Sequence, residues 1–328
     1  MSAFYWPLIG DCRETLKSIP DGSVHCCVTS PPYFGLRDYG MADQIGLEKT
    51  PQAFVAELVA VLREVRRALR DDGTLWLNLG DSYARSPGKG QHKPGQSGGK
   101  NAYVYDRGNG RAASTFLGEG LKEKDLVGIP WRVAFALQED GWYLRQDIIW
   151  QKPNPMPESV TDRCTKSHEY SFLLTKSARY YFDHEAVKEP AVGGQSGNAT
   201  SFKRTGSKRG QTIPGQSYGS HRPDRDTTHY NGEARNRRSV WNVATRPYKG
   251  AHFATFPPEL IEPCILAGCP LGGTVLDPFG GSGTTAGVAN AHGRNAILCE
   301  LNPEYAALMP ARVASIIDRL KQSAHNAP

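Results

Sequence analysis

Short apolar runs that suit buried β-strands alternate with amphipathic helices along most of this chain. Residues 24–29 form a strand-like run, and residues 51–70 carry a helical stripe of apolar side chains that ends before Gly73. Further strands are expected at 8–11, 74–79, 144–150, 170–175, 274–276 and 295–299, and further helices at 130–139, 258–267, about 284–291 and from 303 onward. This alternation predicts an α/β fold with a mostly parallel twisted sheet and helices on both faces.

The length of 328 residues allows one large α/β domain with insertions, or two ordinary domains. No apolar run approaches the roughly 20 residues that a bilayer span needs, and residues 1–10 lack the features of a secretory signal, so we expect a cytoplasmic protein. The seven cysteines include no CxxC pair, and neither disulfides nor a metal site are expected. The adjacent Cys26 and Cys27 are expected to be part of the strand core.

The formal net charge of +6 is distributed unevenly along the chain. Residues 185–250 carry a net charge of +7 and residues 85–125 carry +4, which leaves −5 for the remainder. Both basic segments are rich in Gly, Ser, Gln and Asn, and such composition cannot bury enough surface to order itself alone. They are either solvated flexible loops or surfaces that follow the phosphates of a nucleic acid, and two of them in an otherwise acidic chain favour the nucleic acid.

A glycine-rich turn directly follows the strand expected at 274–276 and leads into a helix. It reads Asp277-Pro278-Phe279-Gly280-Gly281-Ser282-Gly283-Thr284-Thr285. Glycines let the backbone approach a ligand, and a helix N-terminus favours an anionic group. No Lys follows the last Gly, which excludes a P-loop, but a GxGxxA match with Glu300 downstream leaves a dinucleotide site open. The carboxylate of Asp277 argues against that site, because it would repel a pyrophosphate and can hold an ammonium group.

A second motif, Thr29-Ser30-Pro31-Pro32-Tyr33, lies at the end of the strand expected at 24–29. On its own it would be a Pro-Pro turn with a surface Tyr. Together, the two motifs resemble those of the amino-methylating (N6-adenine/N4-cytosine) DNA methyltransferases, which carry a (D/N/S)PP(Y/F/W) catalytic motif and a DxFxGxG cofactor motif. Residues 147–159, 168–170 and 252–257 also resemble segments of that family.

The order of the motifs is similar to that of the circularly permuted β group, because the catalytic motif comes first and a basic segment separates the two. The resemblance implies a Rossmann-like S-adenosylmethionine-dependent methyltransferase fold with a target-recognition insertion. Residues 1–184 would be the catalytic part, with a mobile basic loop at 85–125. Residues 185–250 would be the target-recognition region, and residues 251–328 the cofactor-binding part.

The resemblance also implies that a base of double-stranded DNA flips out and enters at the first motif. Its exocyclic amine is a poor nucleophile, because the nitrogen lone pair is delocalised into the ring. Ser30 Oγ and the carbonyl oxygen of Pro31 would accept the two N–H groups, Pro32 would keep that carbonyl rigid, and Tyr33 would stack on the base. Ser at position 30 leans toward cytosine in the family, but adenine-modifying members with Ser also occur, so both bases stay open.

S-adenosylmethionine is the cofactor that the resemblance implies. Asp277 would hold its methionine ammonium, Glu300 both of its ribose hydroxyls, and Asp11 its adenine. Its methionine carboxylate would lie at the start of the helix after the turn. The other predicted pocket residues are Gly281, Ser282, Gly283 and Thr284 of the turn, together with Thr255, Phe256 and Phe279.

Double-stranded DNA is the expected partner, and a homodimer and a separate cognate restriction enzyme are further possibilities. The basic residues expected to contact the DNA are Lys203, Arg204, Lys208, Arg209, Arg235, Arg237 and Arg238. One alternative is a methyltransferase that acts on RNA or on a protein glutamine, although such enzymes usually carry the cofactor motif first. Another is a non-catalytic DNA-binding protein on the same scaffold, against which the intact motifs count.

Overall fold

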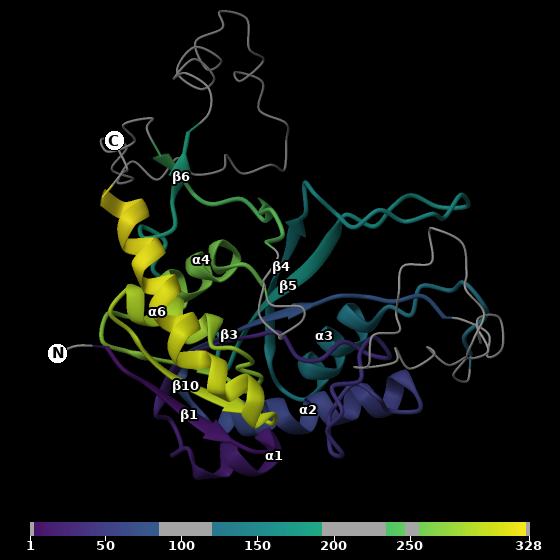
Figure 1. Cartoon of the computed structure of the whole chain (residues 1–328), viewed down its shortest axis with the longest axis horizontal. Helices are drawn as coiled ribbons and strands as arrows, with labels where there is room; N and C mark the ends of the chain where they lie inside the picture. Colours follow the sequence, from purple (N-terminus) through teal and green to yellow (C-terminus); the bar gives the residue numbers. More distant parts are fainter. Residues whose placement is uncertain (1–2, 85–119, 192–233, 247–255, 326–328) are drawn as a thin grey trace, which may run out of the picture. The chain divides into compact units, whose positions relative to one another are not determined.

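A computed structural model describes residues 3–84, 120–191, 234–246 and 256–325 of the chain. The chain divides into two compact units, one made of Met1–Asp183 with Ser239–Pro328 and the other of His184–Arg238. In the described residues, the larger unit holds an eight-stranded sheet and all of the helices (Figure 1). The smaller unit holds the antiparallel pair β6 (Glu189–Pro190) and β7 (Ala234–Arg235).

The large sheet has the strand order β1-β10-β9-β2-β3-β5-β4-β8. All neighbouring strands are parallel except that β5 runs antiparallel to both β3 and β4. The predicted α/β class is therefore confirmed, with a mixed but mostly parallel sheet. The strands are β1 (Tyr5–Ile9), β2 (Val24–Thr29), β3 (Leu69–Leu79), β4 (Tyr143–Gln151), β5 (His168–Thr175), β8 (Val240–Asn242), β9 (Thr274–Asp277) and β10 (Asn295–Glu300).

Helices cover both faces of this sheet. α1 and α3 pack against α2 on one side, and α4 and α6 pack against α5 on the other (Figure 1). Successive side chains of β2 face the two different helical layers. Cys26 lies against Gly268 at the end of α4, whereas Cys27 belongs to the apolar cluster around α2. The helices are α1 (Cys12–Thr15), α2 (Pro51–Ala68), α3 (Ile129–Glu139), α4 (Pro258–Gly268), α5 (Thr284–Ala291) and α6 (Pro303–His325), and a short 3-10 helix spans Leu16–Ser18.

The central strands are buried on both faces, as expected of parallel strands between two helical layers. Cys26 and Cys27 are both fully buried, which confirms that they belong to the core. Phe54 and Leu58 on α2 are also fully buried, so the apolar stripe predicted at 51–70 faces the sheet. Thr50 fixes the start of α2, where its Oγ1 accepts a hydrogen bond of 3.1 Å from the backbone N–H of Ala53.

Two predicted segments lie partly outside the described residues. Of the loop predicted at 85–125 only residues 120–125 are described, and there the backbone N–H of Lys124 donates to the carbonyl of Ala84 at 2.8 Å. Of the region predicted at 185–250, strand β8 belongs to the large sheet, because it pairs with β4. The part of this region assigned to the smaller unit therefore ends at Arg238.

Two further observations concern the described residues alone. None of their helices is long and apolar enough to cross a membrane. They contain no group of three or more His, Cys, Asp or Glu side chains that could hold a metal ion, and all seven cysteines are free thiols.

Helix α5 and helix α6 meet at Gly287, and this contact generates a stability prediction. A Cβ atom at position 287 would lie 2.8 Å from Cβ of Ile316, too close for the helices to keep their spacing. We expect Gly287→Ala to lower the free energy of unfolding by about 1–3 kcal/mol, although alanine intrinsically favours a helix. Thermal denaturation measures the change, and a melting temperature equal to or above that of the wild type would contradict this close packing.

Candidate functional site

The two sequence motifs line one pocket at the carboxyl ends of the parallel strands, where open α/β sheets bind ligands. Ser30 to Tyr33 follow β2, and the glycine-rich turn follows β9. Gly283 is not among the lining residues, and Thr255 lies outside the described residues. The predicted residues that line the pocket are Asp11, Ser30, Pro31, Pro32, Tyr33, Phe256, Asp277, Phe279, Gly281, Ser282, Thr284 and Glu300.

Asp277, the last residue of β9, links the two motifs. Its Oδ1 accepts hydrogen bonds from Thr29 Oγ1 at 2.6 Å and from the backbone N–H of Phe279 at 3.1 Å. Its Oδ2 accepts a hydrogen bond from Thr285 Oγ1 at 2.6 Å. Burial raises the pKa of this carboxyl, and the three hydrogen bonds oppose that rise. Asp277 thus ties the end of β2, directly before Ser30, to the turn and to α5.

Glu300, the last residue of β10, holds the turn from its other side. Its Oε2 accepts a hydrogen bond of 2.7 Å from the backbone N–H of Gly281, and its Oε1 accepts one of 2.8 Å from the backbone N–H of Asn302. Gly281 has a φ of +53°, a left-handed conformation that glycine adopts without steric cost. Burial raises the pKa of Glu300, although the two N–H groups lower it. Both carboxylate oxygens retain acceptor capacity for hydroxyl groups of a ligand.

The turn also contains two buried hydroxyl groups without a hydrogen-bond partner among the described residues. They are Oγ of Ser282 and Oγ1 of Thr284, and both residues line the pocket. Their place at the start of α5 adds the free N–H groups of a helix N-terminus. Buried hydroxyls without partners cost free energy unless a ligand satisfies them. This donor set suits the carboxylate of a small molecule.

Asp11 lies on the pocket wall at the N-cap of α1. Its Oδ1 accepts a hydrogen bond of 2.8 Å from the backbone N–H of Arg13, and its Oδ2 forms an ion pair of 2.6 Å with the same residue. Burial raises the pKa of Asp11, but the bonds with Arg13 outweigh it and the net pKa is lowered. Asp11 is therefore an ionised acceptor whose side chain already has a protein partner.

Tyr33 belongs to a hydrogen-bond network with side chains of β3 and β5. Its hydroxyl donates to Glu169 Oε2 at 2.6 Å and accepts from Asn78 Nδ2 at 2.9 Å. Asn78 Nδ2 also donates to Glu169 Oε2 at 3.0 Å, and Ser30 Oγ lies 3.5 Å from the Tyr33 hydroxyl. Burial, and then the charge of Glu169, raise the pKa of Tyr33, so the phenol is protonated.

The aromatic ring of Tyr33 packs on Gly80 at the end of β3. A Cβ atom at position 80 would lie 2.4 Å from Cε2 of the ring, so only glycine leaves room for it. Lys152 forms an ion pair with Glu169, and its ammonium lies 4.3 Å from the centre of the Trp150 ring. Sequence reasoning assigned no role to these residues, although Lys152 and Glu169 lie in segments that resemble the family.

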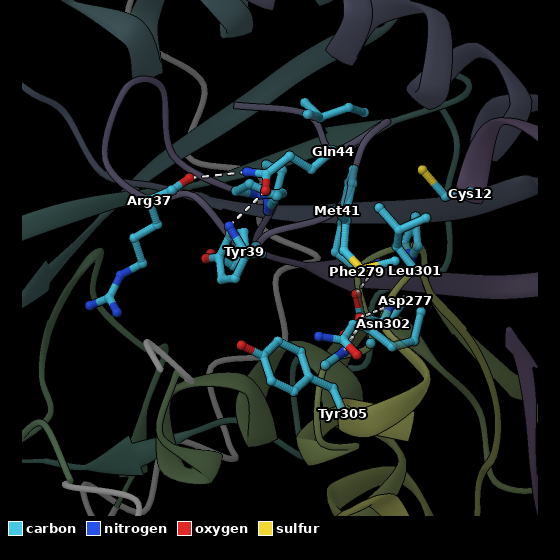
Figure 2. A pocket seen from close by; sticks show the side chains of 18 of the residues that line it. Cys12, Arg37, Tyr39, Met41, Gln44, Asp277, Phe279, Leu301, Asn302 and Tyr305 are labelled. Carbon is cyan, nitrogen blue, oxygen red and sulfur yellow. Dashed lines mark hydrogen bonds between the residues drawn. The ribbon is translucent and has the colours of Figure 1, made fainter. Parts of the chain in front are cut away.

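The segment directly after the first motif also lines the pocket, which sequence reasoning did not predict. Its Tyr39 lies edge-on to Tyr305 of α6, with ring centres 6.4 Å apart, and Figure 2 shows both rings beside the open space. Gln44 holds this segment, because it accepts a hydrogen bond from the N–H of Tyr39 at 2.6 Å and donates one to the carbonyl of Arg37 at 3.1 Å. The lining residues not predicted are Cys12, Leu36, Arg37, Tyr39, Met41, Asp43, Gln44, Ile45, Pro278, Gly280, Leu301, Asn302 and Tyr305.

Of the predicted DNA-contacting residues, Arg235, Arg237 and Arg238 are described. Within the smaller unit, Nε of Arg235 and Nε of Arg238 both donate to Glu189 Oε1, at 2.8 and 2.7 Å. Their contact with DNA stays a prediction. The remaining four, Lys203, Arg204, Lys208 and Arg209, lie outside the described residues.

Comparison with known proteins identifies the family. Residues 24–310 match the DNA methylase family N6_N4_Mtase. The chain belongs to this family. M.Cfr9I, a type II methyltransferase of Citrobacter freundii, is 49% identical over 296 residues, which cover 90% of this chain and 83% of that protein. M.SmaI, a type II methyltransferase of Serratia marcescens, is 46% identical over 309 residues, which cover 93% of this chain and 89% of that protein.

Solved structures of DNA methylases share the fold. PvuII DNA methyltransferase (cytosine-N4-specific) aligns with a TM-score of 0.61 and 18% identity over 97% of this chain and 93% of that chain. A putative DNA modification methylase of Thermus thermophilus, solved with S-adenosyl-L-methionine, aligns with a TM-score of 0.56 and 24% identity over 96% of each chain. This member of the N6/N4 family is an S-adenosylmethionine-dependent DNA amino-methyltransferase.

The hydrogen bonds of Asp277 generate a prediction for this DNA methylase. Asp277→Asn keeps the size of the side chain but turns one acceptor into a donor that opposes Thr29 or Thr285. We expect the free energy of unfolding to fall by about 1–3 kcal/mol and cofactor affinity to fall with it. Chemical denaturation and calorimetric titration with S-adenosylmethionine measure the two effects.

The matched control is Asp72→Asn, because Asp72 forms an exposed ion pair of 3.1 Å with Arg70 away from the pocket. Its effect on stability should be below about 1 kcal/mol, and cofactor affinity should not change. Equal behaviour of the two variants would show that Asp277 does not hold the motifs together.

Proposed function

We propose that this DNA methylase flips an adenine or cytosine of duplex DNA into its pocket and methylates the exocyclic amino group of that base. One observation supports this most strongly: Ser30 to Tyr33 and the glycine-rich turn line the same pocket, and Asp277 of the turn accepts a hydrogen bond from Thr29, directly before Ser30. A base at the first motif and a methyl donor at the second would therefore be neighbours. Such placement removes much of the entropic cost of a reaction between two molecules.

The residues of the turn fit S-adenosylmethionine by the chemistry of their polar groups. When bound, this cofactor supplies a methyl group on a positively charged sulfur. The hydroxyls of Ser282 and Thr284 and the start of α5 would bind its methionine carboxylate, and Glu300 would accept its ribose hydroxyls. The buried carboxyls of Asp277 and Glu300 favour a cationic ligand.

Two of the predicted cofactor contacts compete with bonds inside the protein. The carboxyl of Asp277 already accepts three hydrogen bonds, so the methionine ammonium would be its fourth donor. Asp11 is engaged by Arg13, so its contact with the adenine would be made by a carboxylate that is already ion-paired. Phe256 and Phe279 would form an apolar wall of the cofactor pocket, and Thr255 would line the same pocket.

At the first motif, Ser30 Oγ and the carbonyl oxygen of Pro31 would accept the two N–H groups of the target amine. This pulls the nitrogen toward tetrahedral geometry and frees its lone pair. Pro32 would fix the carbonyl, and Tyr33 would stack on the base with a contact of about 1–3 kcal/mol. Both adenine and cytosine present the same amino group to this motif, so the proposal includes both.

The arrangement of the elements supports a circularly permuted order. Strand β2, with the catalytic motif, precedes β9, with the cofactor turn, in the chain, yet the two are neighbours in the sheet. We propose that residues 1–184 are the catalytic part, residues 251–328 the cofactor-binding part, and residues 185–250 the target-recognition region between them. Within that order, the basic segment at 85–125 would be a mobile loop over the DNA.

The partners follow from the same proposal. The two basic segments would contact duplex DNA, and the seven Lys and Arg residues predicted to do so lie in the segment at 185–250. The relatives M.Cfr9I and M.SmaI are type II methyltransferases, which supports a restriction-modification role and a separate restriction enzyme as partner. A homodimer is a further proposal, without an interface assigned to it.

The test is transfer of labelled methyl groups from S-adenosylmethionine to unmodified duplex DNA. We expect label in the DNA, and sequencing that detects methylated bases should place it on one amino group within one recognition sequence. Tyr33→Ala should suppress transfer at least about tenfold, because stacking on the base is lost, while cofactor affinity stays within about twofold. Tyr143→Ala is the matched control, since Tyr143 is half exposed on β4 and does not line the pocket.

Other outcomes would replace the proposal. Label that enters only RNA or protein would support the alternative substrates. Binding of duplex DNA without transfer would support the non-catalytic alternative. Equal loss of transfer and of cofactor affinity in Tyr33→Ala would contradict the role of Tyr33 at the base.

A further inference from the structure

The proposed reaction leaves one proton that the protein has to remove. An amino nitrogen that gains a methyl group becomes positively charged and must lose one of its two hydrogens. Ser30 is the nearest side chain predicted to contact that nitrogen, and a serine hydroxyl is a weak base. It can take a proton only if it passes its own proton to another group at the same time.

The structure provides such a group through Tyr33. The hydroxyl of Ser30 donates toward the hydroxyl of Tyr33 at 3.5 Å, and the hydroxyl of Tyr33 donates to Glu169 Oε2 at 2.6 Å. The first distance is long for a bond between two hydroxyls, but catalytic hydrogen bonds often shorten only when substrate is bound. The two donors point the same way, from the pocket toward the carboxylate.

The neighbouring side chains fix the direction of these two hydrogen bonds. Ser171 Oγ donates to Asn78 Oδ1 at 2.9 Å, so the amide nitrogen of Asn78 faces Tyr33 and Glu169. Since Asn78 can only donate there, the hydroxyl proton of Tyr33 is directed to Glu169. Lys152 forms an ion pair with the other carboxylate oxygen.

We propose that Glu169 receives the proton of the target amine through Ser30 and Tyr33, an inference that rests on the proposed function. As the methyl carbon exchanges its bond to sulfur for a bond to the amino nitrogen, an N–H bond breaks and an O–H bond forms at Ser30 Oγ in the same step. The hydroxyl proton of Ser30 moves to the Tyr33 hydroxyl, whose own proton moves to Glu169 Oε2. The base ends neutral, both hydroxyls are restored, and Glu169 is a neutral carboxylic acid that returns its proton to water.

Two features agree with this role. The methylated amine of a conjugated base is a far stronger acid than a carboxylic acid, so the transfer runs downhill even beside Lys152. The side chains of Lys152 and Glu169 are 19% and 14% exposed, which gives the proton a route to solvent. Glu169 acts through other residues and is therefore a positioning and proton-accepting residue that does not touch the base.

The experiment measures methyl transfer in a single turnover with saturating cofactor and duplex DNA. Glu169→Gln can still accept a hydrogen bond from Tyr33 but cannot take a proton, and Tyr33→Phe keeps the ring but removes the relay hydroxyl. We expect each variant to slow methyl transfer at least about tenfold. The double variant should be no slower than the slower single variant, because both substitutions interrupt the same proton relay. Affinities for cofactor and DNA should stay within about twofold of the wild type.

The control is Glu64→Gln on α2, where Glu64 pairs with Arg67 and does not line the pocket. It should transfer at the wild-type rate. A second readout separates proton transfer from support of the fold: formate added to Glu169→Ala should raise its transfer rate with concentration, whereas equal chloride should not. The melting temperature of each variant should be measured to check that the variant is folded.

The outcomes separate the two proposals. A wild-type enzyme that methylates no DNA would overturn the proposed function. A wild type that methylates DNA while Glu169→Gln is equally fast would overturn only the relay. Independent, multiplying losses in Glu169→Gln and Tyr33→Phe, or the absence of rescue by formate, would also overturn the relay and leave Glu169 as support for the fold.

Discussion

The buried carboxyl of Asp277 is the interaction on which the rest of the site depends. It receives hydroxyl groups from the end of β2 and from α5, and a backbone N–H from its own turn. Hydrogen bonds to a charged group are each worth about 1.5–3 kcal/mol, and a buried carboxyl without them would be strongly unfavourable. Glu300 repeats the arrangement on the next strand, so two carboxyls hold the glycine-rich turn against the strand ends.

The residues at the pocket fall into two groups with different charged side chains. On the side of the turn, the carboxyls of Asp277 and Glu300 and the partnerless hydroxyls of Ser282 and Thr284 match a cofactor with both an anionic and a cationic end. On the side of the first motif, the carboxylate of Glu169 accepts a hydrogen bond from the Tyr33 hydroxyl and does not itself line the pocket. In the proposed reaction, the first group would bind the charged cofactor and the second would remove a proton.

Much of this could be predicted from the sequence, because it depends on local patterns. Apolar runs and helical stripes located most of the strands and helices, and each motif directly follows its strand. The direction of β5 and the three-residue strand β8 had no local signal, since both depend on pairing with distant segments. The network around Tyr33 was missed for the same reason: Asn78 and Ser171 meet only through the register of β3 with β5.

A crystal structure of the enzyme with a non-reactive analogue of S-adenosylmethionine and duplex DNA tests the shared pocket most directly. It should show one base flipped out, with its amino group donating to Ser30 Oγ and to the Pro31 carbonyl. The amino nitrogen should lie about 3–3.5 Å from the position of the transferable methyl carbon, the distance expected of groups about to react. A flipped base whose amino group lies away from Ser30, or an analogue bound outside the glycine-rich turn, would contradict the shared pocket.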